Sequence, residues 1–370
     1  MKALILTTEV GSRGGVQYAG RLIVRAMRDC LGRDAELTLV TVQDGAADFD
    51  RVGLPCTAFG AGGSRVRMGL RAVRLWVWES WDLVVLAHVN LAALATIADH
   101  VRSAPLLAII HSLEAWRPIA GLRRSGLGRV DRLLYVSQHS RAKSHEANPW
   151  LSSLSNYVCH WGLLPEVDSP QVGAAGQALT NGSPDLFALS IGRMSWSERY
   201  KGHEEMLRLW PAVTRLRPGL RLVFIGDGDD RPRLEELAGG LRIDVQFLGS
   251  VDDATRNRYL ERCQCFCLPT RGEGFGLVFL EAMRAGKPVL AGSNDAGCEV
   301  VVDGLTGRTV DPTNPNELLQ GVLDVSGERA EKFGQAGRQR FAAHFSYDRF
   351  LDRFSRHVAE VTGKGLSGTR

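Results

Sequence analysis

The chain has 370 residues, of which 44% are hydrophobic and 23% are charged, and its formal net charge at pH 7 is +4. The composition is typical of a globular protein, and the length is typical of two domains of ordinary size. The longest apolar run, residues 83–98, contains His88 and Asn90 and is shorter than the roughly 20 residues that cross a bilayer, which excludes a membrane-spanning protein. Residues 1–165 have 19 Lys and Arg against 13 Asp and Glu, so the first half is the better side for an anionic partner.

Seven cysteines are present, and no two have the C-x-x-C spacing of a zinc or redox site. Cys263, Cys265 and Cys267 alternate, so they would share one face of a strand, and histidine partners are lacking nearby. We therefore interpret them as small buried side chains and expect no metal. The first apolar segment, residues 1–6, is too short for the core of a signal peptide. Together with reduced thiols, this favours a cytoplasmic protein.

The first half opens with a strand, a glycine-rich turn and an amphipathic helix. Residues 3–7 are apolar, Gly14 and Gly15 end the turn, and residues 16–31 have helical periodicity. Further strands are expected at residues 36–41, 83–87, 106–110 and 133–137. This order predicts a doubly wound α/β domain. The G-x-G-x-x-G fingerprint is missing here, which argues against a dinucleotide-dependent dehydrogenase.

Residues 64–81 predict a basic amphipathic helix, in which three arginines share one face and residues 66, 70, 73 and 77 share the other. The arginines are Arg67, Arg71 and Arg74. Trp76 and Trp78 lie with Trp81 at the carboxyl end of this segment. Two interpretations stay open, a surface helix packed on the sheet and a helix that contacts anionic lipid head groups. Nucleic acid is not expected as a partner, since nothing resembles a base-reading module.

Two histidines follow apolar strands. His88 comes after residues 83–87, and His111 comes after residues 106–110. In open α/β sheets, ligands bind at the carboxyl ends of the strands. His111 also precedes an arginine-rich segment, residues 114–129, and we predict that it faces a substrate. His88 is the weaker candidate, with packing of its loop as the alternative.

Residues 168–185 are rich in Gly, Ala, Ser and Pro and have no apolar periodicity, so we interpret them as an interdomain linker. Strands and helices alternate again from residue 186. The fold class is therefore predicted as α/β, with two doubly wound Rossmann-like domains facing across a cleft. The expected parts are a first domain at residues 1–167, the linker, a second domain at residues 186–345 and a carboxyl-terminal helix at residues 346–363.

Residues 270–286 predict a loop that turns directly into a helix. Three closely spaced glycines let the backbone of this loop approach a ligand. They are Gly272, Gly274 and Gly276. The free N–H groups at the start of such a helix suit an anion, whereas Glu273 and Glu281, eight residues apart, are good acceptors for sugar hydroxyls. Amides for phosphate and carboxylates for hydroxyls together predict a sugar-nucleotide site.

Two cations accompany this loop in the second half. Arg193 follows the apolar residues 186–191 and so extends from the end of a strand, and Lys201 comes shortly before a predicted helix. An Arg and a Lys on one rim neutralise the charge of a departing diphosphate. The Gly-Asp-Gly turn at residues 226–228 is a weaker signal, with a purely structural role as the alternative.

These motifs resemble the donor site of the retaining glycosyltransferases with a GT-B fold. The family (glycosyltransferase family 4, group 1) is large and includes sucrose synthase and bacterial phosphatidylinositol and lipopolysaccharide mannosyl- and glucosyltransferases. The specific part of the resemblance is the E-x7-E pair, Glu273 and Glu281, with its interior Gly-Phe-Gly. Arg193, Lys201 and His111 match further landmarks. The chain departs from the family at residues 159–163, Cys-His-Trp-Gly-Leu, where an Asn-Gly-Val-Asp turn is usual.

The resemblance implies a role for each of these residues. Arg193 and Lys201 would hold the donor diphosphate, and Glu281 would accept a hydrogen bond from the ribose. Glu273 would bind hydroxyls of the transferred sugar, and His111 would orient that sugar and support its developing positive charge. The other donor contacts that the resemblance implies are Gly14, Gly15, Gly274, Phe275, Gly276 and Leu277.

The resemblance also implies a reaction. Such enzymes need no metal or other cofactor and retain the anomeric configuration. The expected donor is a GDP- or UDP-sugar, and residues 193–201 look like those of mannosyltransferases, which favours mannose from GDP-mannose over glucose. The expected acceptor is a saccharide or a polyprenyl-linked saccharide in polysaccharide or glycolipid synthesis, reached at an anionic membrane surface if residues 64–81 bind lipid. A sugar-nucleotide 2-epimerase and a non-catalytic nucleotide-sugar-binding protein stay open as alternatives.

Overall fold

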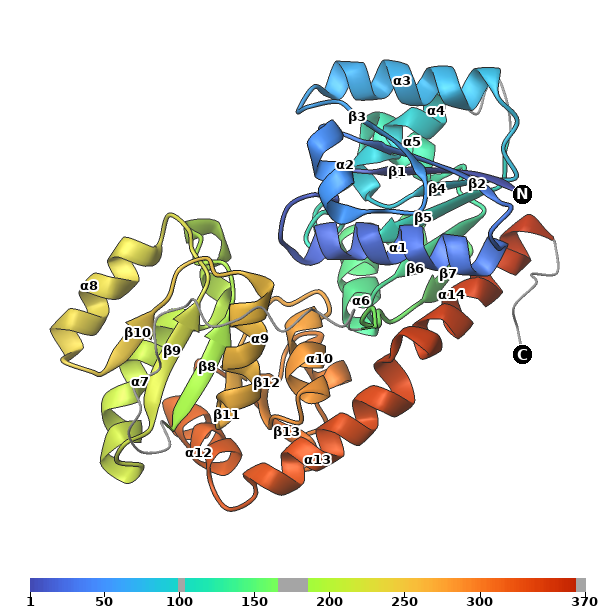
Figure 1. The fold of residues 1–370 in the computed structure, drawn as a ribbon. Helices are drawn as coiled ribbons and strands as arrows, with labels where there is room; N and C mark the ends of the chain where they lie inside the picture. Colours follow the sequence, from blue (N-terminus) through green and yellow to red (C-terminus); the bar gives the residue numbers. More distant parts are fainter. Residues whose placement is uncertain (99–103, 166–185, 364–370) are drawn as a thin grey trace. The chain divides into compact units, whose positions relative to one another are not determined.

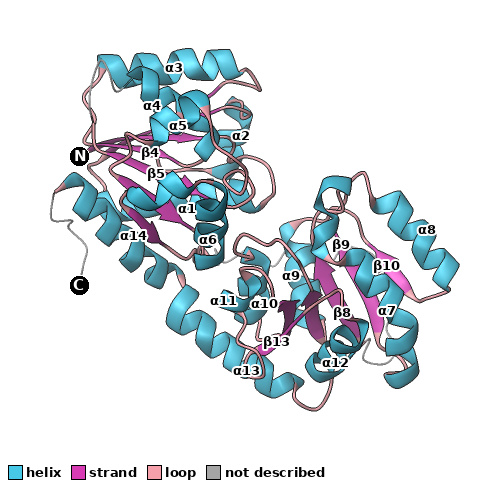
Figure 2. Cartoon of the chain, turned by 180° about the vertical axis from the view of Figure 1, so that it is seen from behind, coloured by secondary structure: helices cyan, strands magenta, loops and turns pink. Residues whose placement is uncertain are grey.

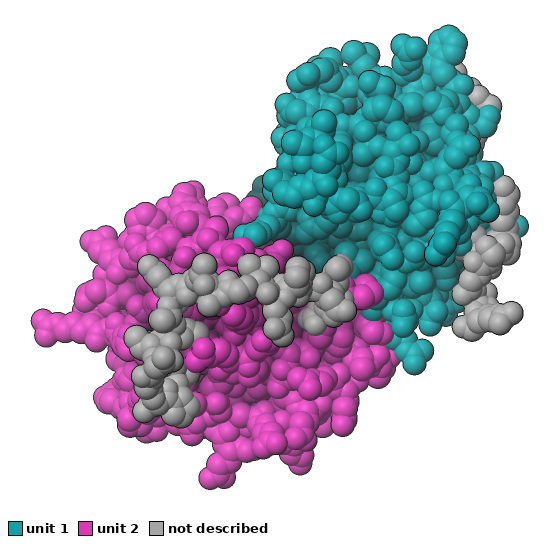
Figure 3. Space-filling view, in the orientation of Figure 1, with its two compact units in different colours: residues 1–164, 347–370 teal, residues 165–346 magenta. Residues whose placement is uncertain are grey.

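The structure is a computed structural model that describes residues 1–98, 104–165 and 186–363. The chain forms two compact units, Met1–Leu164 with Tyr347–Arg370, and Pro165–Ser346 (Figure 3). Each unit has its own parallel sheet and its own hydrophobic core. The linker expected at residues 168–185 and the tail at residues 364–370 lie outside the described residues.

The sheet of the first unit has seven parallel strands in the order β3-β2-β1-β4-β5-β6-β7. They are β1 (Lys2–Thr7), β2 (Glu36–Thr41), β3 (Thr57–Gly60), β4 (Leu83–Leu86), β5 (Leu106–Ile110), β6 (Arg132–Tyr135) and β7 (Asn156–Val158). The chain starts at β1, winds outward to β3 and then crosses to β4 on the other side of β1. The loops after β1 and β4 therefore flank the point at which ligands bind in doubly wound sheets.

Helices cover both faces of this sheet (Figures 1 and 2). They are α1 (Gly15–Leu31), α2 (Ala46–Val52), α3 (Arg65–Trp78), η1 (Val89–Leu91), α4 (Ala93–Ala98), α5 (Gly121–Leu127), α6 (Gln138–Ala147), η2 (Pro149–Ser153) and α14 (Tyr347–Thr362). One face packs with α3, α4 and α5 in a continuous core, and on the other face α1 packs against α14. Tyr347 Oη donates a hydrogen bond to Asp29 Oδ2 at 2.5 Å, which ties the start of α14 to α1.

The second unit repeats this plan with six parallel strands in the order β10-β9-β8-β11-β12-β13. They are β8 (Phe187–Ile191), β9 (Arg221–Ile225), β10 (Val245–Phe247), β11 (Cys265–Leu268), β12 (Val289–Gly292) and β13 (Gly307–Val310). Its helices are η3 (Trp196–Lys201), α7 (His203–Leu216), α8 (Arg231–Leu241), α9 (Asp253–Arg262), α10 (Leu277–Arg284), α11 (Gly297–Val300), α12 (Pro315–Ser326), α13 (Ala330–Arg340) and η4 (Phe341–Phe345). The order changes direction between β8 and β11, so the loops after these two strands flank the ligand-binding edge.

The predicted α/β class, with two doubly wound parallel sheets, is confirmed. The alternating cysteines are buried, as expected, and the Sγ atoms of Cys265 and Cys267 lie 3.8 Å apart on β11. No helix in the described part of the chain combines the length and the apolar character that crossing a bilayer requires.

Helix α3 corrects one prediction for the basic segment. Trp76 is fully buried and shares the core face with Met68 and Ala72 at helical spacing of four residues, so it is not available to a membrane surface. Val66 and Leu70 belong to the face that residues 66, 70, 73 and 77 were predicted to share. Their side chains do not lie in the core but are 72% and 69% exposed. Trp78 is 79% exposed and stays available. The face of α3 with Met68, Ala72 and Trp76 is the one that packs on the sheet.

Candidate functional site

The glycine-rich loop joins β11 to α10 in the second unit. As predicted, it turns directly into the helix, which begins at Leu277. Gly276 precedes it in a left-handed conformation with φ 89°. A Cβ atom at this position would lie 2.3 Å from Cδ2 of Phe279, so both the conformation and the space require glycine. The loop backbone therefore runs closely over the first turn of the helix.

A buried carboxylate that was not predicted holds this loop in place. Asp295, in the loop after β12, has no exposed surface. Its Oδ2 accepts hydrogen bonds from the Glu273 amide at 2.9 Å and from Thr270 Oγ1, and its Oδ1 accepts from the Gly297 amide at 2.8 Å. Burial raises the pKa of Asp295 to about 6, although these three hydrogen bonds act in the opposite direction. The nearby charge of Glu273 adds to the rise.

Lys201 lies between two carboxylates at the end of η3. Its Nζ is 3.7 Å from Glu273 Oε2 and 3.8 Å from Glu198 Oε2, and all three side chains are at most 21% exposed. Arg193 Nη2 is 3.3 Å from Glu198 Oε1, while the Arg193 side chain is 66% exposed. The structure thus brings together three predicted residues, Arg193, Lys201 and Glu273. Glu198 was missed, although its spacing of three residues from Lys201 was visible in the sequence.

Glycines allow the loops of this edge to pack closely. At Gly226, where φ is 137°, a Cβ atom would lie 2.0 Å from the carbonyl oxygen of Gly192. At Gly202, where φ is 82°, it would lie 2.3 Å from the carbonyl oxygen of Pro269. The turn after β9 therefore supports the loop that carries Arg193, and the end of η3 lies directly on the chain leaving β11. The Gly-Asp-Gly turn has this structural role.

Glu281 lies on α10, buried apart from 9% of its surface. Its Oε1 is 3.4 Å from Nη1 of Arg256 on α9. Burial raises the pKa of Glu281, and the charge of Arg256 opposes this rise. A carboxylate held in this way is a strong acceptor for a hydroxyl group that reaches it. Arg256 was not among the predicted residues.

In the first unit, Gly14 and Gly15 lie where the loop after β1 enters α1, at the predicted position. The loop is anchored by Asp44, which is buried after β2. Asp44 Oδ2 accepts from the Val10 amide at 2.9 Å and Oδ1 accepts from the Gly11 amide at 2.8 Å. The two units thus use the same device, a buried carboxylate that binds the amides of a glycine-rich loop.

His111 follows β5, and its ring is fixed from several sides. His111 Nε2 is 2.7 Å from the carbonyl oxygen of Ala87. Because a carbonyl oxygen only accepts hydrogen bonds, Nε2 carries a proton and donates it to Ala87. The rings of His88 and Trp161 lie 5.9 Å and 5.8 Å away. The His111 amide donates to Glu114 Oε1 at 2.6 Å, and its carbonyl accepts from Ser140 Oγ at 3.1 Å.

His88 is held neutral near pH 7, because burial lowers its pKa to about 4. Its Nδ1 accepts a hydrogen bond from the Asn90 amide at 3.1 Å, at the start of η1. His88 therefore organises the turn after β4. The remaining predicted residues of the first unit, Arg67, Arg71, Arg74 and Trp78, lie on α3.

Residues 186–327 match the family described as glycosyl transferases group 1. Over 284 residues, the chain is 34% identical to the phosphatidyl-myo-inositol mannosyltransferase of Mycobacterium leprae, and the match spans 73% of this chain and 72% of that protein. It is also 27% identical to the glycogen synthase of Mycobacterium tuberculosis over 312 residues, which are 77% of this chain and 71% of the relative.

Among solved structures, the fold is similar to that of the Anabaena protein HepE in complex with UDP and glucose. The match has a TM-score of 0.75 at 19% identity and covers 97% of this chain and 100% of that chain. At this identity, the likeness shows the fold, which is the GT-B arrangement.

Proposed function

The chain belongs to the group 1 glycosyltransferases, which transfer a sugar from a nucleotide sugar, and we propose that it moves a hexose to a saccharide or lipid-linked acceptor with retention of the anomeric configuration. The observation that carries this proposal is the contact of Lys201 with Glu273 at the ligand-binding edge of the second sheet. A cation for phosphate and a carboxylate for sugar hydroxyls lie side by side there, as a nucleotide sugar requires.

The proposed donor contacts are compatible with this geometry. The diphosphate binds Lys201 and the exposed guanidinium of Arg193, together with the amides of Phe275 and Gly276 at the start of α10. Because Lys201 is shared between Glu198 and Glu273, a bound diphosphate competes with these carboxylates for its charge. Glu273 is then free to accept from hydroxyls of the sugar. Gly274 and Leu277 complete the loop contact.

Glu281 accepts a hydrogen bond from the ribose, which replaces part of the solvation that burial has removed from this carboxylate. Gly14 and Gly15 are assigned to the diphosphate because glycine lets a backbone come close to a ligand. His111, with its ring fixed by Ala87 and stacked on Trp161, orients the transferred sugar.

In the proposed reaction, the bond between the anomeric carbon and the leaving phosphate oxygen breaks, and the acceptor oxygen bonds to the same face of that carbon. The acceptor proton passes to the leaving phosphate oxygen. Arg193 and Lys201 stabilise the negative charge that develops on the diphosphate, which is the role a metal ion has in other transferases. No metal or other cofactor is required in this scheme.

We favour mannose as the sugar and GDP-mannose as the donor. The support is the 34% identity to a mannosyltransferase, together with the mannosyltransferase-like stretch at residues 193–201. The similarity to a glycogen synthase keeps glucose as the second hexose. For the acceptor we favour a saccharide on a polyprenyl or other lipid carrier, because three arginines and Trp78 are exposed on α3 and suit an anionic membrane surface. The enzyme would then act as a peripheral protein at the inner face of the membrane.

Thermal unfolding with GDP, UDP, ADP and their sugars tests the donor. A nucleotide that binds the folded state stabilises it by mass action, by about 2.7 kcal/mol at 100 times its dissociation constant. We expect the largest shift with GDP-mannose. A shift with UDP-glucose alone would contradict the choice of mannose.

Two substitutions test the reaction. Lys201→Met and Glu273→Gln should each lower the rate of transfer at least roughly 100-fold, in the range seen when one charge-stabilising donor is removed. Lys332→Met, which removes an exposed lysine from α13, serves as the control and should leave the rate unchanged. Unaltered transfer in both variants would contradict the assigned site. Product formed without any acceptor would indicate a 2-epimerase, and donor binding without turnover would indicate a binding protein.

A further inference from the structure

Trp116 lies in the loop after β5, shortly beyond His111, and packing in the core does not account for it. Ala115 before it and Ile119 after it are buried in the core of the first unit. The Trp116 side chain between them is only half-buried. Among the described residues, the half-buried side chains that pack against this core include Trp150 but not Trp116. A large aromatic ring that the core does not use therefore lies in a loop at the ligand-binding edge of the first sheet.

One buried side chain fixes the loop on both sides of Trp116. Asn148 is 2% exposed. Its Nδ2 donates hydrogen bonds to the carbonyl oxygens of Ala115 at 2.8 Å and Arg117 at 3.0 Å. Its Oδ1 accepts a hydrogen bond from the Ile119 amide at 2.6 Å. Because the residues directly before and after Trp116 are bound to the same side chain, the position of the ring is set before any ligand arrives.

The indole is also connected to His111. Trp116 Nε1 donates to Ser140 Oγ at 3.4 Å, and Ser140 Oγ donates to the carbonyl oxygen of His111 at 3.1 Å. The ring of His139 is inclined at 74° to the indole, with the two centres 5.4 Å apart, which fixes the orientation of the indole as well. A group that rests on Trp116 would therefore lie near the sugar that His111 orients in the proposed reaction.

We propose that Trp116 binds a pyranose ring of the acceptor. The face of an indole carries partial negative charge, and the C–H bonds on the flat face of a pyranose carry partial positive charge, so the two stack while the hydroxyl groups point outward. This inference rests on the proposed function and names the class of its acceptor, which ends in a saccharide and is not a lipid without sugar. The nucleoside of the donor is assigned to Glu281 in the second unit, which leaves the acceptor as the partner of this ring.

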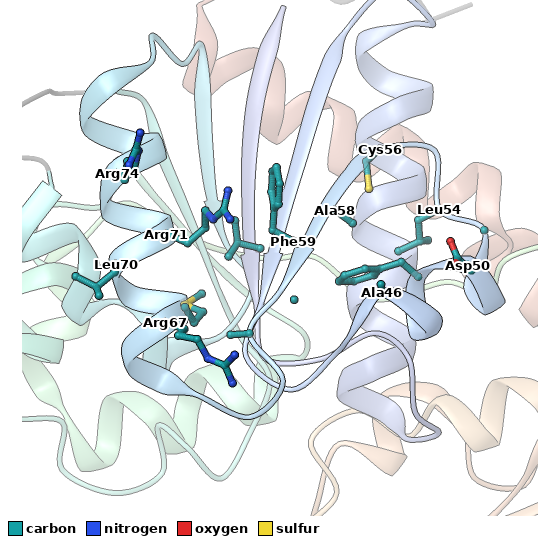
Figure 4. Close-up of a pocket in the computed structure, with 16 residues that line it drawn as sticks. Ala46, Asp50, Leu54, Cys56, Ala58, Phe59, Arg67, Leu70, Arg71 and Arg74 are labelled. Carbon is teal, nitrogen blue, oxygen red and sulfur yellow. The ribbon is translucent and has the colours of Figure 1, made fainter.

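A groove between α3 and β3 of the first unit is a second place in which a sugar could meet an aromatic ring (Figure 4). Phe49 and Phe59 are its aromatic lining residues. The Arg71 guanidinium lies 4.4 Å from the centre of the Phe59 ring, and Figure 4 shows Arg71 reaching toward that ring. A face of Phe59 is thus already covered by a cation, so Phe59 serves as the matched control for Trp116.

Saturation-transfer NMR measures sugar binding without turnover, because it reports which hydrogens of a weakly bound sugar lie against the protein. We would titrate the full chain with methyl α-D-mannopyranoside and methyl β-D-glucopyranoside, and with mannitol and sorbitol, which carry similar hydroxyl groups on open chains. At least one pyranoside should bind saturably and receive more saturation on one face of its ring than on the other, whereas the open-chain polyols should not bind saturably. Equal binding of the polyols, equal saturation of both faces, or no binding of either pyranoside would overturn the proposal.

Substitutions at Trp116 separate stacking from apolar packing. Trp116→Leu keeps an apolar side chain without a π face and should weaken pyranoside binding about fivefold, in the range that the loss of an aromatic contact gives. Trp116→Phe keeps an aromatic face, and its affinity should stay within about twofold of that of the natural chain. Phe59→Leu should leave the affinity unchanged. Circular dichroism confirms the fold of each variant. Full affinity in Trp116→Leu, or a loss in Phe59→Leu, would refute the assignment of the sugar to Trp116.

Calorimetry with GDP and UDP distinguishes a failure of this inference from a failure of the proposed function. We expect Trp116→Leu to bind the nucleotide as tightly as the natural chain does, because the nucleotide contacts are assigned to other residues. Loss of nucleotide and pyranoside binding together in Trp116→Leu would overturn a separate acceptor contact. Pyranoside binding by a natural chain that binds neither nucleotide would contradict the proposed function, and with it the role of the pyranoside as acceptor. A loss of pyranoside binding in Glu273→Gln but not in Trp116→Leu would place the sugar in the donor site and would also overturn the inference.

Discussion

Asp295 gives the sharpest test of how the donor loop is held, because its burial predicts a pH dependence of stability with a defined sign and size. Its carboxyl group has a pKa of about 6 in the folded chain, against an ordinary value of 3.8. Between these pH values the folded chain binds a proton that the unfolded chain has released. Stability falls with rising pH wherever the folded state binds more protons. The loss is complete above pH 6 and amounts to about 3 kcal/mol, at about 1.36 kcal/mol per pKa unit.

The substitution Asp295→Asn removes this titration. An amide accepts hydrogen bonds through one atom only, so the N–H of Glu273 or of Gly297 loses its acceptor, at a cost of about 1–3 kcal/mol that does not depend on pH. The pH-dependent part of the change in stability can therefore be separated from the constant cost of the lost hydrogen bond. From the two pKa values, the free energy of unfolding of the natural chain, relative to that of the variant, should fall by about 2 kcal/mol between pH 4.5 and 7.5.

Urea denaturation at a series of pH values measures this difference. A protein with two units generally unfolds in two transitions. The free energy of unfolding is taken from the transition that the substitution shifts. Asp244→Asn, which removes an exposed carboxylate in the same unit, controls for the loss of one negative charge. If the curves for Asp295→Asn and the natural chain run parallel from pH 4.5 to 7.5, the carboxylate is not desolvated, and our account of the loop is wrong.

Three further predictions concern packing and binding. In thermal denaturation, Trp76→Ala should lose about 3–5 kcal/mol and Trp78→Ala less than about 0.5 kcal/mol, and equal losses would contradict the orientation of α3. Gly226→Ala, which brings Cβ to 2.0 Å from a carbonyl oxygen, should lose more than about 2 kcal/mol, whereas Gly239→Ala, with open space inside α8, should gain up to about 1 kcal/mol. Glu281→Gln should weaken donor binding by calorimetry about tenfold, or about 1.4 kcal/mol, and unchanged affinity would exclude its contact with the ribose.

Much of the fold was predictable because buried parallel strands have a strong local pattern. β5 is a continuous apolar run, and β2 is a mostly buried stretch of Leu, Val and Thr. The predicted bounds of both strands are the observed ones. β3 was missed because it has four residues at the sheet edge, two of them exposed, inside a connection rich in glycine. α12 was missed although its Asn cap and first-turn proline are legible in the sequence.

The site was predictable only where its chemistry is local. The glycine-rich loop, Glu273 and Lys201 follow from turn and helix-start patterns that a single segment carries. Asp295 could not be found in this way, since an Asp beside Ser, Asn and Gly reads as an ordinary turn residue, and only packing with β11 and α10 buries it. The burial of Trp76 could not be predicted from its own segment either, because it depends on which face of α3 packs on the sheet.

Trp161 links His111 to the last helix of the chain. Its ring is 5.8 Å from the His111 ring and 5.4 Å from that of Phe350 on α14. It belongs to the segment where this chain departs from the usual family turn, and α14 begins directly after Ser346, the last residue of the second unit.

This arrangement has a consequence for building chimeric transferases. An exchange of the donor-binding unit between relatives should use junctions at residues 164/165 and 346/347, so that α14 stays with the parent of the first unit. A junction placed after α14 would combine Trp161 with a foreign partner in place of Phe350 and would release the ring that stacks on His111. The modular boundary of this protein for engineering is therefore discontinuous in sequence.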